Sequence, residues 1–161
     1  MPDLPANKVL DIKTAQSKAE SYCAYQERSQ QEVRDKLYTY GLYSSDVEEL
    51  ISVLIQSNFI NEERFACSYA LGKFRIKHWG RKKISQGLKL KRVGDNLIKK
   101  ALNQISEIEY QDSLNLLIQK KAALIKEKDK YKRRQKLIQY ATAKGYESDL
   151  IFDCLNSSGL F

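Results

Sequence analysis

The feature that most constrains the fold of this chain is an internal repeat with a period of about 50 residues. Six positions in residues 33–51 recur at an offset of 51, and again after a further 53; only the Arg of the second copy departs from the shared character. The matched sets are Val33, Leu37, Gly41, Leu42, Val47 and Ile51; Ile84, Leu88, Arg92, Val93, Ile98 and Leu102; and Leu137, Ala141, Gly145, Tyr146, Ile151 and Leu155. A repeat of this length is typical of stacked helical units that cannot bury their apolar faces alone.

Within each copy the apolar residues recur every three to four positions, which predicts α-helices rather than strands. Both prolines, Pro2 and Pro5, precede this pattern, so the strongest helix breaker is absent from the rest of the chain. We therefore predict an all-α protein with nine helices. Their expected ranges are 13–27, 29–41, 45–57, 61–78, 81–91, 94–105, 109–127, 130–144 and 147–157.

Short polar signals mark where several of these helices begin and end. Ser29 with Glu32, and Ser45 with Glu48, each match a capping box, in which the Ser and Glu side chains satisfy backbone amides of the first turn. Other residues are expected to cap a helix start or to end a helix in the left-handed conformation. These are Asn61, Gly80, Gly41 and Gly145.

The repeat divides the chain into a tail and three units of three helices each. We expect a tail at 1–12, a first repeat at 13–57, a second, basic repeat at 58–108 and a third repeat at 109–161. Neighbouring units should share a quasi-continuous core and form an elongated, curved, right-handed-type helical array. Such a body suits lying along another surface. The charged stretch at 119–134 is expected to project as a solvated rod.

The net charge of +8 is concentrated in the middle of the chain. Residues 1–57 carry −3, residues 58–108 carry +8 and residues 109–161 carry +3. This asymmetry indicates that the middle segment meets a polyanion or an acidic partner surface. A solvated lysine-rich face would explain the charge equally well, so charge alone leaves both interpretations open.

The cations between residues 73 and 92 form the candidate binding surface, which we call the basic ridge. If Ile84 and Leu88 face the core, Lys82 and Lys89 fall on the opposite side of their helix. Several cations on one surface would neutralise phosphates without reading bases, and Trp79 is expected to pack at a helix start rather than stack on a base. The basic ridge consists of Lys73, Arg75, Lys77, Arg81, Lys82, Lys83, Lys89, Lys91 and Arg92.

Several kinds of chemistry lack the residues they need. His78 is the only histidine, no cysteines are closely spaced, and the glycines form no phosphate-binding loop. We therefore expect no enzyme, no metal and no cofactor. Three widely spaced cysteines predict no disulfides and a reducing, cytoplasmic location. No apolar run has the length of a signal peptide or of a membrane span.

One group of spaced residues resembles the pattern of the RecX family. It combines an acidic pair followed by Arg-Phe-Ala, a Tyr three residues after that Ala, and a Gly, Ile and Leu further on. The residues of this motif are Arg64, Phe65, Ala66, Tyr69, Gly80, Ile84 and Leu88. Upstream, Arg28, Ser29, Glu32, Leu37 and Gly41 resemble the pattern of the family's first unit. The resemblance is good over residues 15–105 and weak in the third unit.

The resemblance implies a function that the other patterns do not give. Family members lie in the groove of a RecA recombinase filament and modulate it, most often by inhibiting its ATPase, strand-exchange and coprotease activities. The implied partners are therefore the RecA filament and single- or double-stranded DNA, bound without sequence preference and without a membrane, and we expect a monomer. The alternatives are a stand-alone nucleic-acid-binding helical module and a helical protein-interaction scaffold.

Two positions depart from the family pattern. Arg92 stands where the family usually has Gly, so either that turn differs or Arg92 adds a cation to the basic ridge. Lys73 stands where the family has Arg, which keeps the charge but loses the bidentate geometry of a guanidinium.

Overall fold

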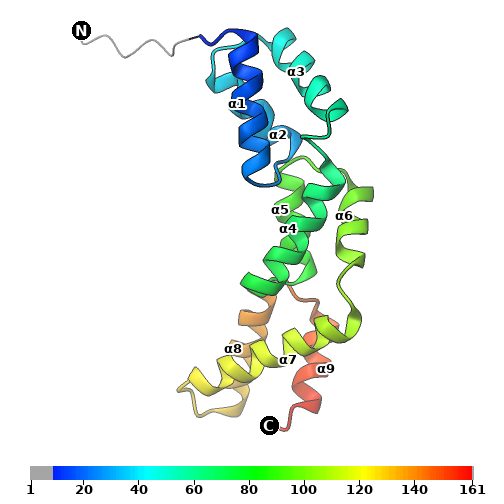
Figure 1. Cartoon of the computed structure of the whole chain (residues 1–161). Helices are drawn as coiled ribbons and strands as arrows, with labels where there is room; N and C mark the ends of the chain where they lie inside the picture. The colour runs from blue at the N-terminus through cyan, green and yellow to red at the C-terminus, as the bar shows by residue number, and fades with distance from the viewer. Residues whose placement is uncertain (1–8, 161) are drawn as a thin grey trace, which may run out of the picture.

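The computed structural model describes residues 9–160 and contains nine helices in that part of the chain (Figure 1). Their bounds differ from the expected ones by no more than three residues. The helices are α1 (Ile12–Tyr25), α2 (Gln30–Thr39), α3 (Ser44–Gln56), α4 (Glu62–Lys77), α5 (Arg81–Leu90), α6 (Asp95–Asn103), α7 (Glu107–Leu124), α8 (Lys130–Ala143) and α9 (Ser148–Ser157). The prediction of an all-α fold is therefore confirmed.

The helices pack in three consecutive groups. The main contacts are made within α1–α3, within α4–α6 and within α7–α9. The groups follow one another along the long axis of an extended, gently bent body, with the first and last described residues at opposite ends (Figure 1). The middle group, which carries the basic ridge, thus touches both of the others.

Most of the predicted helix signals are confirmed. Ser29 and Glu32 form the reciprocal capping box, and the Asn61 side chain accepts a hydrogen bond from the first turn of α4. Gly41 and Gly145 both have positive φ angles, of 82° and 98°.

The second predicted capping box is wrong. Helix α3 begins two residues earlier than that box requires, because the tight turn after Gly41 buries Leu42 and places Tyr43 at the N-cap without a side-chain hydrogen bond. Ser45 is therefore already inside the first turn. Glu48 turns away from the helix start and forms an ion pair with Arg34 at 2.6 Å.

The three copies of the repeat share the same turn, including at the position that departs from glycine. Arg92 has a φ of 59°, and its N–H donates to Lys89 O at 2.9 Å, as Gly41 N–H donates to Tyr38 O at 3.0 Å and Gly145 N–H donates to Thr142 O at 2.9 Å. An altered turn at Arg92 is thus not observed. The matched apolar positions are all buried except Leu102, which is half-buried.

The expectation of one quasi-continuous core is correct for two of the three groups. A single apolar cluster runs through α4–α9, where Phe74 stacks on Tyr110 and Tyr110 packs against Tyr146. The core of α1–α3 is a separate cluster that ends at Ile60. The first group is joined to the second largely by polar contacts, which are described below.

The predicted rod at 119–134 is also wrong. Helix α7 ends at Leu124, and α8 turns back to pack against it. Arg133 stabilises this hairpin, because its guanidinium donates to the carbonyl oxygens of Ala122 at 2.6 Å and Ile125 at 3.1 Å. Of the helices in residues 9–160, none is long and apolar enough to cross a membrane.

Candidate functional site

The basic ridge lies on the last turns of α4 and along α5, on either side of a tight reversal. His78 ends α4 with a φ of 58°, while His78 N–H and Trp79 N–H donate to the carbonyl oxygens of Phe74 and Lys73. This left-handed helix end folds α5 back beside α4. The nine predicted cations then divide between positions at the junctions of the groups and positions open to solvent.

Arg81 is held at the junction between the second and third groups. Its guanidinium lies 3.8 Å from the centre of the Tyr110 ring and forms ion pairs with Glu107 at 2.6 Å and Glu147 at 2.8 Å. The Tyr110 hydroxyl donates to Glu147 at 2.5 Å and accepts from the backbone N–H of Arg81 at 3.0 Å. Burial raises the pKa of this buried tyrosine well above its usual range. Arg81 therefore fixes one unit against the next.

Three more of the predicted cations also have partners in a neighbouring group. Arg75 pairs with Glu109 at 3.1 Å, toward the third group. In the other direction, the Lys91 ammonium lies 2.5 Å from a carboxylate oxygen of Glu32. Arg92 donates to the Gln31 side chain at 3.3 Å. The junction with the first group thus consists of charged and polar contacts.

The remaining five cations form the open part of the basic ridge. Lys77, Lys82 and Lys89 are exposed and form no ion pair within residues 9–160, and Lys82 and Lys89 lie opposite buried Ile84 and Leu88 as expected. The other two are half-buried and flank the indole of Trp79. We call this set the open cations: Lys73, Lys77, Lys82, Lys83 and Lys89.

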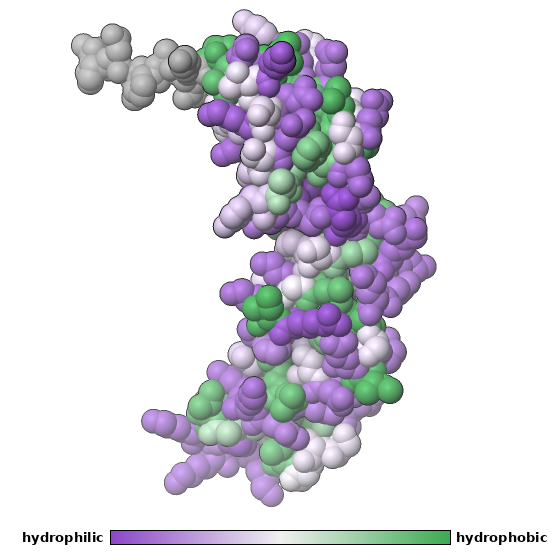
Figure 2. Space-filling view, in the orientation of Figure 1, coloured by the Kyte–Doolittle hydropathy of each residue, from purple (hydrophilic) through white to green (hydrophobic). Residues whose placement is uncertain are grey.

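Trp79 is flanked by two of the open cations. The ammonium groups of Lys73 and Lys83 lie 4.9 and 4.6 Å from its ring centre. The indole also packs against the shared core of α4–α9, as a residue at a helix start would. Lysines held at an aromatic ring by cation–π attraction keep their charge at the surface. Figure 2 shows the visible face of the middle of the molecule as mainly hydrophilic, with small apolar patches.

The residues of the family motif build the middle group. Phe65, Ala66, Ile84 and Leu88 are all core residues. The Tyr69 hydroxyl lies over Gly87. A Cβ added at Gly87 would be only 2.1 Å from the hydroxyl oxygen of Tyr69. The absence of a side chain at that glycine therefore lets the tyrosine ring cross α5.

Two further motif residues make the junctions. Arg64 pairs with Glu27 at 2.5 Å and donates to the carbonyl oxygen of Asn58 at 3.0 Å, which joins α4 to the first group. At the other junction, Gly80 lies so close to Gly145 that an added Cβ would meet its carbonyl carbon at 2.3 Å. The motif therefore encodes the packing of the middle unit and its two neighbours.

The partners of Arg81 could not be found from local sequence patterns. Glu107 and Glu147 lie 26 and 66 residues away from it in the chain. The repeat gives the only hint in the sequence: Glu147 comes two residues after Gly145, which marks the turn of the third unit. No group of His, Cys, Asp and Glu in the described residues is arranged to hold a metal ion.

Models of RecX domains match two parts of the chain. The second three-helix domain of RecX matches residues 61–102, and the third three-helix domain matches residues 107–155. A crystal structure of RecX from Lactobacillus salivarius superimposes with a TM-score of 0.83 at 26% identity, over 93% of this chain and 97% of that one. Another crystal structure of a regulatory protein RecX gives 0.80 at 25% identity, over 91% and 74%.

Curated sequences agree with the domain matches. The regulatory protein RecX of Clostridium perfringens strain 13 is 33% identical over 132 residues, which are 81% of this chain and 59% of that protein. The regulatory protein RecX of Bacillus mycoides is 28% identical over 90% of this chain and 54% of its own length. The chain thus spans a little over half the length of these relatives. The domain models, the solved structures and the curated relatives agree with the three-helix groups on the page, and the chain belongs to the RecX family.

Proposed function

We propose that this protein lies in the groove of a RecA recombinase filament and modulates the activity of RecA. The expected effect is inhibition of ATP hydrolysis, strand exchange and coprotease activity. The observation that carries this proposal is the set of open cations at the centre of an extended body with the RecX fold. A regulator of this kind acts by binding in the cytoplasm as a monomer and performs no chemistry of its own.

The open cations supply the contact with DNA or with an acidic filament surface. Exposed lysines neutralise phosphates and release counterions, which gives affinity without sequence preference. Both single- and double-stranded DNA fit this chemistry. The remaining cations of the basic ridge act indirectly, because their partners are carboxylates and an amide of the neighbouring groups. These are Arg75, Arg81, Lys91 and Arg92.

The direct test is the DNA-stimulated ATPase of the cognate RecA, measured with increasing amounts of this protein. We expect a dose-dependent fall in the rate, and the double variant Lys82→Glu/Lys89→Glu should need at least tenfold more protein for the same effect. Lys13→Glu/Lys99→Glu is the matched control, because it makes the same change in net charge at exposed positions away from the open cations. An unchanged ATPase rate at several-fold excess over RecA, without binding, would refute the proposal.

A second candidate is a stand-alone nucleic-acid-binding module, which is favoured by the lysine-flanked indole of Trp79. This candidate predicts the same DNA affinity with and without RecA, falling steeply as salt rises. Fluorescence anisotropy with a labelled oligonucleotide at two salt concentrations separates the two candidates. Affinity that depends on RecA supports the filament regulator.

A further inference from the structure

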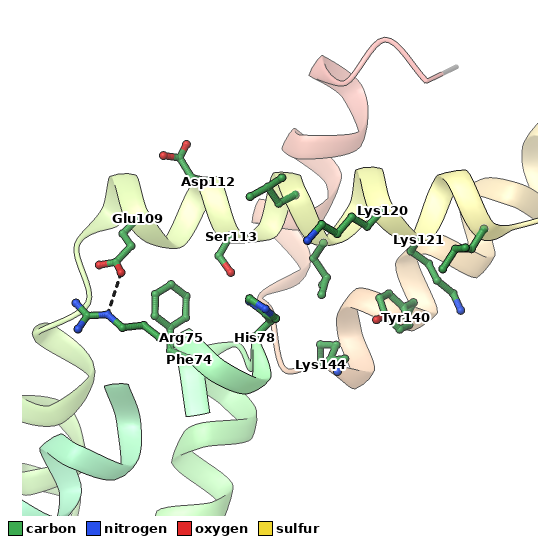
Figure 3. A pocket seen from close by; sticks show the side chains of 13 residues that line it. Phe74, Arg75, His78, Glu109, Asp112, Ser113, Lys120, Lys121, Tyr140 and Lys144 are labelled. Atoms are coloured by element: carbon green, nitrogen blue, oxygen red, sulfur yellow. Dashed lines mark hydrogen bonds and ion pairs between the residues drawn. The ribbon is translucent and has the colours of Figure 1, made fainter. Parts of the chain in front are cut away.

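The third group carries a groove that lies outside the open cations. It runs between α7, the end of α4 and α8, and has a volume of about 550 Å³ (Figure 3). Its floor is apolar, with Phe74 and Leu117 buried beneath it. Two leucines of α7 line it while remaining largely in water, since Leu116 is 55% exposed and Leu124 is 76% exposed. Leaving two large apolar side chains in water at one groove is a cost that binding would remove.

The rim of this groove is positive toward the end of α7. Lys120, Lys121 and Lys144 line that half, and none of them forms an ion pair within the described chain (Figure 3). The ammonium groups of Lys121 and Lys144 lie 4.6 and 5.8 Å from the ring centre of Tyr140. In the other half, Glu109 is already paired with an arginine of α4, and the Asp112 carboxylate points away from the α4 and α8 side of the groove (Figure 3). The groove therefore offers unpaired positive charge beside exposed leucines.

The spacing along α7 indicates the shape of the occupant. Leu116, Lys120 and Leu124 follow one another at four-residue intervals, which places them on one side of the helix over about 12 Å. A row of this kind pairs with the apolar face of another helix. Nucleic acid would fit the lysines but would leave the leucine floor without a partner. Lys121 lies near the C-terminus of α7, where its charge also interacts favourably with the helix dipole. That interaction does not explain why the two leucines are exposed.

We propose that this groove binds an acidic amphipathic helix of a partner protein. Apolar residues of that helix cover Leu116 and Leu124, and its acidic residues face Lys120, Lys121 and Lys144. The binding needs neither the open cations nor DNA, so the proposal stands or falls independently of the proposed function.

The probe is a fluorescein-labelled peptide of 16 residues, about 24 Å long as a helix. It carries leucines at alternating three- and four-residue spacing on one face and glutamates on both flanks. Anisotropy titration of the full chain should show saturable binding. Two control peptides should bind at least tenfold more weakly: one with the leucines scattered around the helix, and one with every glutamate replaced by lysine.

Protein variants locate the binding. Leu116→Glu/Leu124→Glu should weaken binding of the acidic peptide at least tenfold, and Lys120→Glu/Lys144→Glu should do the same while improving the lysine peptide. Ile108→Glu is the matched control, because Ile108 is 77% exposed on the same helix and does not line the groove. All substituted side chains reach solvent, and circular dichroism melting curves verify that each variant remains folded.

Three results would overturn the proposal. The first is no binding of the acidic peptide at 0.1 mM protein, a concentration set on the order of a weak helix–groove affinity. The second is an oligonucleotide whose binding is lost in the leucine variant, which would make nucleic acid the occupant. The third is a dimer in sedimentation experiments that dissociates in the leucine variant, which would make a second copy of this chain the occupant.

Discussion

Replacing Gly80 by Ala should disrupt the packing between the second and third groups of helices and lower the stability of the protein. Gly80 has a φ of −79°, which alanine adopts without strain, so the cost comes from contact alone. An added Cβ would lie 2.3 Å from the carbonyl carbon of Gly145, 2.4 Å from its oxygen and 2.5 Å from the nitrogen of Tyr146. All three atoms belong to the backbone, so no side-chain rotation relieves the overlap.

The magnitude follows from the hydrogen bonds at that junction. Gly80 N–H donates to Lys144 O at 2.7 Å and Lys82 N–H donates to Gly145 O at 3.0 Å. Leaving a buried backbone group without its partner costs about 1–3 kcal/mol, so the loss of both bonds should lower the free energy of unfolding by about 3 kcal/mol. For a chain of this size that corresponds to a fall in Tm of about 6–12 °C.

Urea titration followed by circular dichroism and by the fluorescence of Trp79 measures this effect, because the indole is the only one in the chain and adjoins the junction. Gly72→Ala is the control. Gly72 lies inside α4 with nothing within 4 Å of an added Cβ, so the same substitution should stabilise the protein by about 0.5–1 kcal/mol. A Gly80→Ala protein within about 0.5 kcal/mol of the unchanged one, a margin typical of neutral surface substitutions, would refute the steric argument.

Three further substitutions test other parts of the structure by urea unfolding. Arg92→Gly should raise the free energy of unfolding by about 0.5–1 kcal/mol, because Arg92 holds a φ of 59° that glycine adopts without strain. A lower free energy of unfolding would mean that the contact of Arg92 with Gln31 outweighs the strain. Tyr110→Phe should cost about 1–3 kcal/mol by leaving Glu147 and the Arg81 amide without the hydroxyl, and an unchanged value would contradict that network. Burial raises the pKa of Glu62, so its charged form destabilises the fold as the pH rises above 4.5. Glu62→Gln should therefore be more stable than the unchanged protein at pH 7 and should lose that advantage at pH 3. If the difference in unfolding free energy between the two proteins is the same at both pH values, the desolvation of Glu62 is disproved.

Local sequence patterns predicted what local physics determines. The helices follow from apolar spacing, and the caps at Ser29 and Asn61 follow from side chains that reach only three residues. Ser45 fits the same local rule but fails it, because the burial of Leu42 sets where α3 begins. Local chemistry alone therefore cannot place a helix start that follows a buried turn.

The candidate site was predicted as a region rather than as individual contacts. Lys82 and Lys89 are exposed as the helical spacing required. Arg81 lies one residue before Lys82 and has the same charge, yet it is fixed by two carboxylates from the third unit. Only the folded arrangement separates a cation that holds units together from one that is open to solvent. The apolar groove on α7 has the same origin, because it exists only where α4, α7 and α8 meet.

The separate core of α1–α3 makes the bending stiffness of the molecule uneven along its length. Bending between the second and third groups would expose the stacked rings of Phe74 and Tyr110 and open backbone hydrogen bonds. Bending between the first and second groups only requires exchanging contacts such as Lys91–Glu32 and Arg64–Glu27 for water, and partly exposed ion pairs of this kind contribute about 0–1 kcal/mol each. The N-terminal third therefore forms a compliant arm on a stiff two-unit rod, and added salt softens the joint between them by screening its charges.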